Sequence, residues 1–127
     1  MPRVKWLRDE ILLVAEVGLE NQWVSEPPDE EIEAVSVLLR SGKLHTQHIE
    51  IDEKFRNWNG VKRKYYDLYT ARSSYPGKRT NGGKTTLAVV QFLEKNPDVV
   101  KAEAVQVRKM LAGGSYSKRR IPGLLEE

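Results

Sequence analysis

The chain has 127 residues, of which 39% are apolar and 31% charged, and its net charge at neutral pH is +3. This length suits one domain with its own core, and the high charge content favours a small, mainly α-helical domain over a closed β-barrel. Because the sequence contains no cysteine, no apolar N-terminal leader and no apolar run of about 18 residues, it excludes a disulfide framework, a cysteine-based zinc site and a membrane-spanning helix, and we expect a cytoplasmic protein.

Residues 5 to 19 have the periodicity of an amphipathic helix. Residues without polar groups recur at the i, i+4, i+7 and i+11 positions: Leu7, Ile11, Val14 and Gly18. This spacing predicts one buried stripe, which Trp6, Leu13 and Val17 widen. Asp9 and Glu10 lie in the first turns, where carboxylates stabilise the positive end of a helix.

A connector with two consecutive prolines leads to a second helix, predicted from about residue 28 to Arg40. Its buried face should hold Ile32, Val35, Leu38 and Leu39. Acidic side chains crowd its N-terminal end, and we expect this end to lie away from any nucleic acid.

Residues 43 to 56 lack a clean period and are predicted to form a structured loop with one helical turn near Asp52. They contain both histidines, His45 and His48, whose spacing could place them on one helical face. No cysteine completes a ligand set, and the nearby Glu50 and Asp52 do not form a recognisable frame. We therefore predict no metal site and no cofactor.

The third helix is predicted to begin at Asn59, a good capping residue, and to end at about Ala71. Its i, i+4, i+7 positions are apolar and should face the core: Val61, Tyr65 and Leu68. The side chains expected on the outer face are Lys62, Arg63, Tyr66 and Thr70. A recognition helix in a major groove needs this division, and three such helices resemble a helix-turn-helix of the Myb-like or winged type.

Residues 73 to 83 read as a loop, with a turn at Pro76-Gly77 and a glycine pair at its end. The run Gly83-Lys84-Thr85 ends like a P-loop, but that motif needs glycine at position 78, which is Lys78. A glycine-rich run that enters a helix can still hold one phosphate of a nucleic-acid backbone with its N–H groups.

Two further helices are predicted, from about Thr85 to Lys95 and from Pro97 to about Leu111. Their expected core residues are Val89, Val90, Leu93, Val100, Ala104, Val107 and Leu111. The prediction is thus a compact bundle of about five helices with little or no β structure. Residues 1–112 should form this domain, and residues 113–127, with three consecutive basic residues, a flexible C-terminal tail.

Positive charge is concentrated in one segment, residues 55 to 84, which has a net charge of +7 against −6 before it and +2 after it. Aromatic residues are interleaved with these cations, as phosphate neutralisation combined with base contact requires. The alternative interpretation is a solvated basic helix and loop without a ligand.

The same segment carries a family resemblance. Phe55-Arg56-Asn57-Trp58-Asn59-Gly60-Val61, Gly82-Gly83-Lys84, Asn96-Pro97-Asp98 and Ala102-Glu103-Ala104 stand at the intervals found in the N-terminal domain of McrA-like HNH endonucleases, which act on 5-methylcytosine. The resemblance covers about residues 5 to 110. Trp58 stands where the family has proline; it could stack on a base or fill the core. Asp67 replaces an asparagine and could pair with an arginine or accept from a cytosine amino group.

The resemblance implies a reader of double-stranded DNA that recognises 5-methyl- or hydroxymethylcytosine in a restriction system. The nuclease motifs of the family are absent from the sequence, so we expect a binding domain and not an enzyme, with an HNH nuclease module as a conceivable partner. The alternatives are a small phage or mobile-element regulator that binds unmodified DNA, and a protein-interaction or inhibitor module with a basic docking face. The oligomeric state is left open. The residues expected to contact DNA are Arg56, Asn57, Trp58, Asn59, Lys62, Arg63, Lys64, Tyr66, Arg72, Lys78, Arg79, Asn81, Gly82, Gly83 and Lys84.

Overall fold

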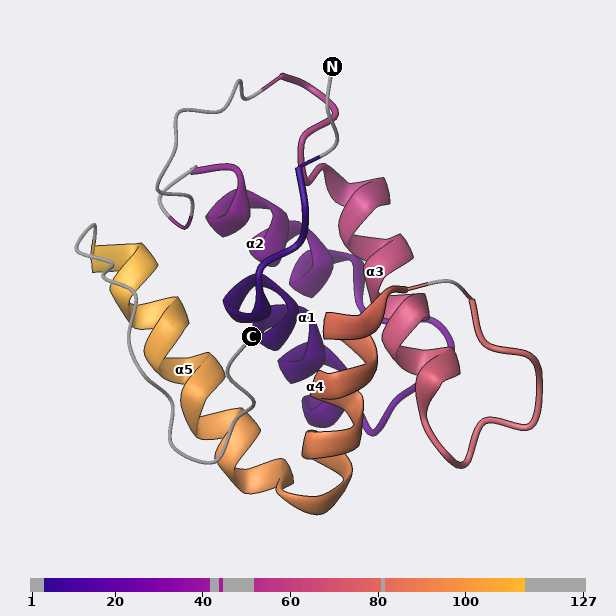
Figure 1. The fold of residues 1–127 in the computed structure, drawn as a ribbon. Coiled ribbons are helices and arrows are strands. Elements are labelled where there is room, and N and C mark those ends of the chain that lie inside the picture. The colour runs from indigo at the N-terminus through magenta and orange to yellow at the C-terminus, as the bar shows by residue number, and fades with distance from the viewer. Residues whose placement is uncertain (1–3, 42–43, 45–51, 81, 114–127) are drawn as a thin grey trace.

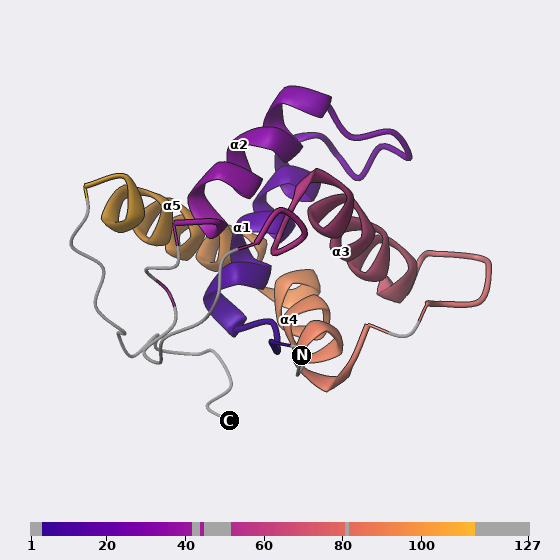
Figure 2. The same ribbon diagram turned by 90° about the horizontal axis from the view of Figure 1, so that it is seen from above.

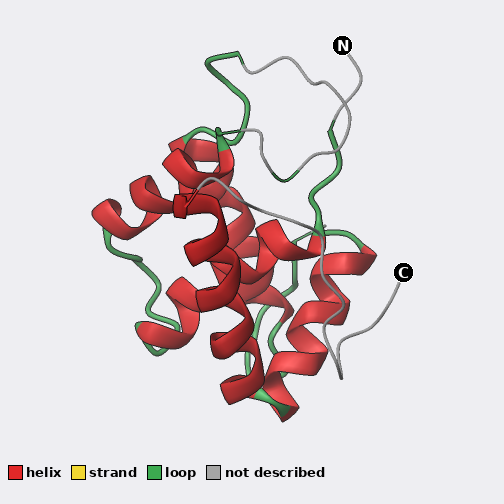
Figure 3. Cartoon of the chain, turned by 90° about the vertical axis from the view of Figure 1, so that its left-hand side faces the viewer, coloured by secondary structure: helices red, strands yellow, loops and turns green. Residues whose placement is uncertain are grey.

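The computed structural model describes residues 4–41, 44, 52–80 and 82–113 of the chain. These residues form five helices and no strand (Figure 1, Figure 3). The helices are α1 (Arg8–Glu20), α2 (Asp29–Leu39), α3 (Trp58–Ala71), α4 (Lys84–Lys95) and α5 (Pro97–Gly113). The predicted mainly α-helical bundle of five helices is therefore confirmed. None of the described helices is long and apolar enough to cross a membrane.

The first helix is the centre of the bundle, and α2, α3, α4 and α5 all pack against it (Figure 1, Figure 2). Five consecutive residues, from Ile11 to Ala15, are apolar and buried, so the middle of α1 is enclosed on every side. The predicted single stripe was too narrow there, because a helical segment with neighbours all around it buries all of its faces.

The other helices bury the faces that their periodicity predicted. The third helix packs against α1, α2 and α4, and its Val61, Tyr65 and Leu68 are fully buried. The predicted core residues of α4 and α5 are buried as well, and α5 lies along α1 at one side of the bundle (Figure 1). In α2, Leu38 is only partly buried, whereas Ile32, Val35 and Leu39 belong to the core.

The cap of α3 differs from the prediction. The helix begins at Trp58, and the side chain of Asn57 accepts a hydrogen bond from the Gly60 N–H over 2.9 Å. Asn59, the predicted cap, is exposed inside the first turn. Both asparagines could cap equally well by propensity, so the choice depends on where the preceding chain is held.

The connections between helices vary greatly in length. α2 ends at Leu39 and α3 begins at Trp58, whereas one residue, Asn96, separates α4 from α5. A helix-turn-helix motif joins its helices by a turn of about 3–4 residues, and none of these connections has that length. The predicted helix-turn-helix core is therefore not confirmed and stays a prediction.

Part of the predicted loop of residues 43 to 56 lies outside the described residues, as do both histidines and the tail from residue 114 on. Where the loop is described again, Asp52 accepts hydrogen bonds from the N–H groups of Lys54 and Phe55, over 2.9 and 3.0 Å. This turn lies where the sequence predicted one near Asp52.

Candidate nucleic-acid interface

The outer face of α3 is basic at its centre. Arg63 is exposed, and Lys62 and Tyr66 beside it are half-buried. Tyr66 OH donates to the backbone oxygen of Ser25 over 2.5 Å, and Lys62 Nζ lies 3.6 Å from Glu26 Oε2. The connector between α1 and α2 thus borders this face on one side. Arg63 is the most exposed cation of the face.

Residues 72–80, hereafter the basic loop, extend outward from the end of α3 (Figure 1, Figure 2). At the start of the loop, the Ser73 N–H and hydroxyl both donate to Glu94 Oε2, over 3.0 and 2.8 Å. At its end, Thr80 bonds to Asp67 and Thr70 of α3. Because the loop covers it, Thr70 is buried, which corrects the prediction that it faces outward.

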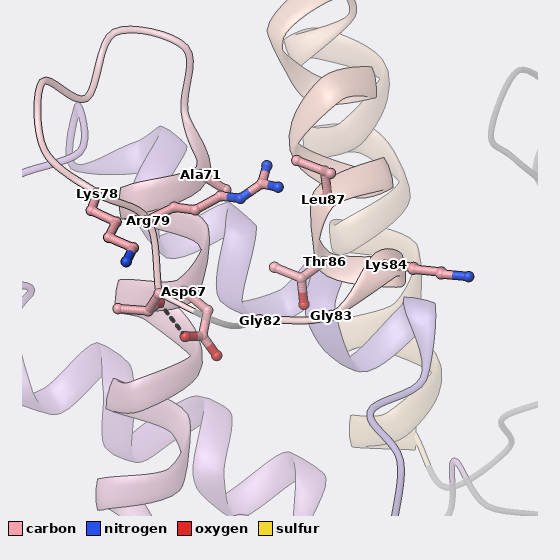
Figure 4. Close-up of a pocket in the computed structure, with 10 residues that line it drawn as sticks. Asp67, Ala71, Lys78, Arg79, Gly82, Gly83, Lys84, Thr86 and Leu87 are labelled. Carbon is pink, nitrogen blue, oxygen red and sulfur yellow. Dashed lines mark hydrogen bonds between the residues drawn. The ribbon is translucent and has the colours of Figure 1, made fainter.

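An open groove of about 480 Å³ lies between the end of α3, the basic loop and the first turn of α4 (Figure 4). Its lining consists of Asp67, Ala71, Lys78, Arg79, Thr80, Gly82, Gly83, Lys84, Thr86 and Leu87. Arg63 precedes Asp67 by four residues, so it lies one helical turn from the groove on the same side of α3.

Two glycines shape the floor of the groove. Gly83, the residue before α4, has a φ of 89° and caps the helix without a side chain, a conformation that glycine adopts without strain. A β-carbon on Gly82 would lie 2.8 Å from the β-carbon of Asp67, so only glycine lets the chain pass so close to α3. No side chain caps α4, and the N–H groups of an uncapped first helical turn are the kind of donors that bind an anion.

Four cations around this groove have no hydrogen-bond or ion-pair partner within the described part of the chain: Arg63, Lys78, Arg79 and Lys84. All four are exposed. In Figure 4 the Lys84 side chain extends from α4 away from the basic loop, so the cations flank the helix start on both sides. Such charges remain available to an external polyanion.

Two of the predicted contact residues lie inside the molecule instead. Arg56 is 8% exposed; its Nε donates to Glu10 Oε2 over 2.9 Å, and its guanidinium carbon lies 4.2 Å from the centre of the Trp6 ring. Lys64 is 7% exposed and donates to Gly82 O and Thr86 Oγ1. Burial lowers the pKa of Lys64, while the Asp67 carboxylate opposes this shift. Both cations are thus engaged within the fold.

The remaining residues that were predicted to contact DNA differ in how far they are exposed. Trp58 is partly buried against the core, with Lys62 Nζ 4.7 Å from its ring centre. Arg72 is half-buried, and its guanidinium lies 4.6 Å from the Tyr69 ring centre and 5.4 Å from that of Trp23. Asn57 caps α3, Asn59 is exposed, and Asn81 lies outside the described residues.

The sequence prediction did not identify Thr70 and Thr80, which fix the loop to α3, or Thr86, which bonds to Lys64 from α4. One feature of the sequence could have indicated this polar network: Asp67 is the single acid among eight basic residues of the segment 55–84. Its partners are Lys64 and Thr80, and not an arginine. Across the described residues, no group of three or more metal-ligating side chains comes together.

Comparison of the chain with protein-family models, with curated proteins and with solved structures gave no match.

Proposed function

We propose that this protein binds double-stranded DNA through the outer face of α3 together with the groove beside it. The observation that carries the proposal is a set of four exposed cations without an ion-pair partner among the described residues: Arg63, Lys78, Arg79 and Lys84. Three other cations of the segment pair with acids within the fold: Arg56 with Glu10, Lys62 with Glu26 and Lys64 with Asp67. The positive charge that remains therefore points to a partner outside the protein.

In this proposal α3 lies along the major groove, which admits an α-helix. Arg63 is placed to reach a base edge, and Lys62 and Tyr66 contact bases or sugars beside it. Lys78, Arg79, Lys84 and the open N–H groups of α4 hold the phosphates of the backbone. The chain acts as a binding domain and not as an enzyme, and a cytoplasmic location is part of the proposal.

The test is fluorescence polarisation with a labelled duplex at several salt concentrations. We expect a dissociation constant of about 1 µM or tighter at about 50 mM salt, and a log–log salt slope of about −3 for the three cations assigned to phosphates. The variant Arg79→Ala should make the slope less steep by about one without changing sequence preference. No binding even at low salt would overturn the proposal and favour docking of an acidic protein.

We also propose that the protein prefers modified cytosine. The support for this preference is the resemblance to McrA-like endonuclease domains. Duplexes of one sequence with cytosine, 5-methylcytosine or hydroxymethylcytosine test this preference. A base-reading contact is worth about 1–3 kcal/mol, so we expect the preferred duplex to bind at least about fivefold more tightly. Equal binding of all three would favour a regulator of unmodified DNA.

A further inference from the structure

The end of the basic loop is fixed to α3 by a polar network. Thr80 Oγ1 donates to Asp67 Oδ1 over 2.5 Å, and the Thr80 N–H donates to Thr70 Oγ1 over 3.0 Å. Figure 4 shows the first of these bonds as a dashed line. Thr80 directly follows Lys78 and Arg79 in the chain, so this attachment fixes the backbone next to both cations.

The network continues beneath the loop toward α4. The second oxygen of Asp67 lies 3.5 Å from Lys64 Nζ, and Lys64 Nζ donates to Gly82 O over 3.3 Å and to Thr86 Oγ1 over 3.1 Å. Asp67 is buried, and both of its carboxylate oxygens have a partner. The carboxylate is therefore positioned to hold α3, the basic loop and the start of α4 in one arrangement.

We propose that Asp67 and Thr80 are positioning residues for DNA binding, because they hold the basic loop so that Lys78 and Arg79 stay beside the first turn of α4. This inference rests on the proposed function. It also runs against simple electrostatics, since removing an acid from a surface that binds a polyanion normally strengthens binding. Loss of Asp67 should weaken binding here, because the apparent dissociation constant rises as the fraction of molecules with a correctly placed loop falls.

The sharpest test changes Thr80, because Thr80→Val removes the side-chain hydrogen bonds of the attachment to Asp67 and Thr70 without altering charge. If the loop of Thr80→Val is in place in roughly a third to a tenth of the molecules, its dissociation constant should rise about three- to tenfold. Thr80→Ser keeps the hydroxyl donor and should bind like the wild type. Ser74→Ala, a matched hydroxyl removal at an exposed loop position without a described partner, should also bind like the wild type.

Two independent measurements separate positioning from a general loss of structure. Trypsin should cut the Arg79–Thr80 bond faster in Thr80→Val than in the wild type, as mass spectrometry of the fragments would show. The melting temperature should fall by no more than about 5 °C, because the change removes two hydrogen bonds of one exposed hydroxyl, each worth about 0.5 kcal/mol. Weaker binding while the melting temperature stays within this limit identifies a positioning effect.

The acid itself supplies a second test with a matched control. Asp67→Asn and Glu26→Gln each remove one negative charge next to a lysine of α3. We expect Asp67→Asn to weaken DNA binding and Glu26→Gln, at an exposed ion pair, to leave it unchanged or strengthen it. If both variants strengthen binding, or if Thr80→Val binds like the wild type, the positioning role is wrong although DNA binding stands. If the wild type does not bind DNA, the proposed function fails first, and the positioning role in binding fails with it.

Discussion

Two arginines seven positions apart show how strongly the surroundings decide the role of one residue type. Arg56 has a φ of 47°, an unfavourable backbone conformation for a non-glycine residue. Its side chain compensates through Glu10, the carbonyl oxygens of Val4 and Lys5, and the rings of Trp6 and Phe55. Arg63 makes no such contact and is exposed. The first arginine should therefore serve stability, and the second is free to bind DNA.

The same substitution should lower stability at position 56 and DNA binding at position 63. Arg56→Met removes the cation that balances the charge of the fully buried Glu10 carboxylate, so the free energy of unfolding should fall by about 3–5 kcal/mol. Arg63→Met should change it by less than about 0.5 kcal/mol while weakening DNA binding. Urea titration of both variants measures the difference. Equal stability of the two would show that the Arg56–Glu10 pair does not hold the chain together.

At the scale of elements, α3 is defined by how it begins and by what covers its far end. Asn57 caps its first turn, and Phe55 and Arg56, both buried, hold the residues before it. At the other end the basic loop folds back over Thr70. The basic outer face of α3 is thus limited to its central turns, between the connector that carries Glu26 and the groove in front of α4.

The cap of α3 can be tested with its neighbour as the control. Asn57→Ala removes the acceptor for the Gly60 N–H and should lower the free energy of unfolding by about 1 kcal/mol. Asn59→Ala changes an exposed residue in the first turn and should leave stability within about 0.5 kcal/mol. Thermal or urea unfolding measures both. A larger loss for Asn59→Ala would place the cap at the position expected from the sequence.

At the scale of the whole molecule, Tyr65 joins the core of α3 to the connector between α1 and α2. Its ring is fully buried, and its hydroxyl donates to Val24 O over 2.6 Å. Burial raises the pKa of Tyr65 to about 12, against a smaller opposing effect of Arg72. The folded protein therefore keeps this proton at a pH where the unfolded chain has lost it.

This shift predicts how stability depends on pH. The contribution of Tyr65 is fully present below pH 10 and is lost as the pH rises from about 10 to about 12, because only the unfolded chain ionises in that window. After allowance for solvent screening, the loss should be about 1–2 kcal/mol. Tyr65→Phe should be less stable at neutral pH but show a smaller decline over this window, as urea titrations at each pH would show. Parallel declines for the two proteins would contradict the shift.

The sequence by itself determined the helices, their buried faces and the polarised charge. Hydrophobic periodicity is a local property, so Val61, Tyr65 and Leu68 could be assigned to the core without knowing their neighbours. The same periodicity predicted Arg63 on the outer face of its helix, and Arg63 is exposed, as are Lys78, Arg79 and Lys84 of the predicted loop and turn. Their role in DNA binding stays a proposal.

Only the tertiary structure decided which cations remain unpaired. Arg56 and Glu10 are 46 positions apart, and Lys64 reaches Thr86 across 22 positions. A local pattern cannot anticipate such pairs, because burial and charge compensation depend on segments that meet only when the chain folds. For the same reason the sequence could not show that Thr80 attaches the basic loop to Asp67.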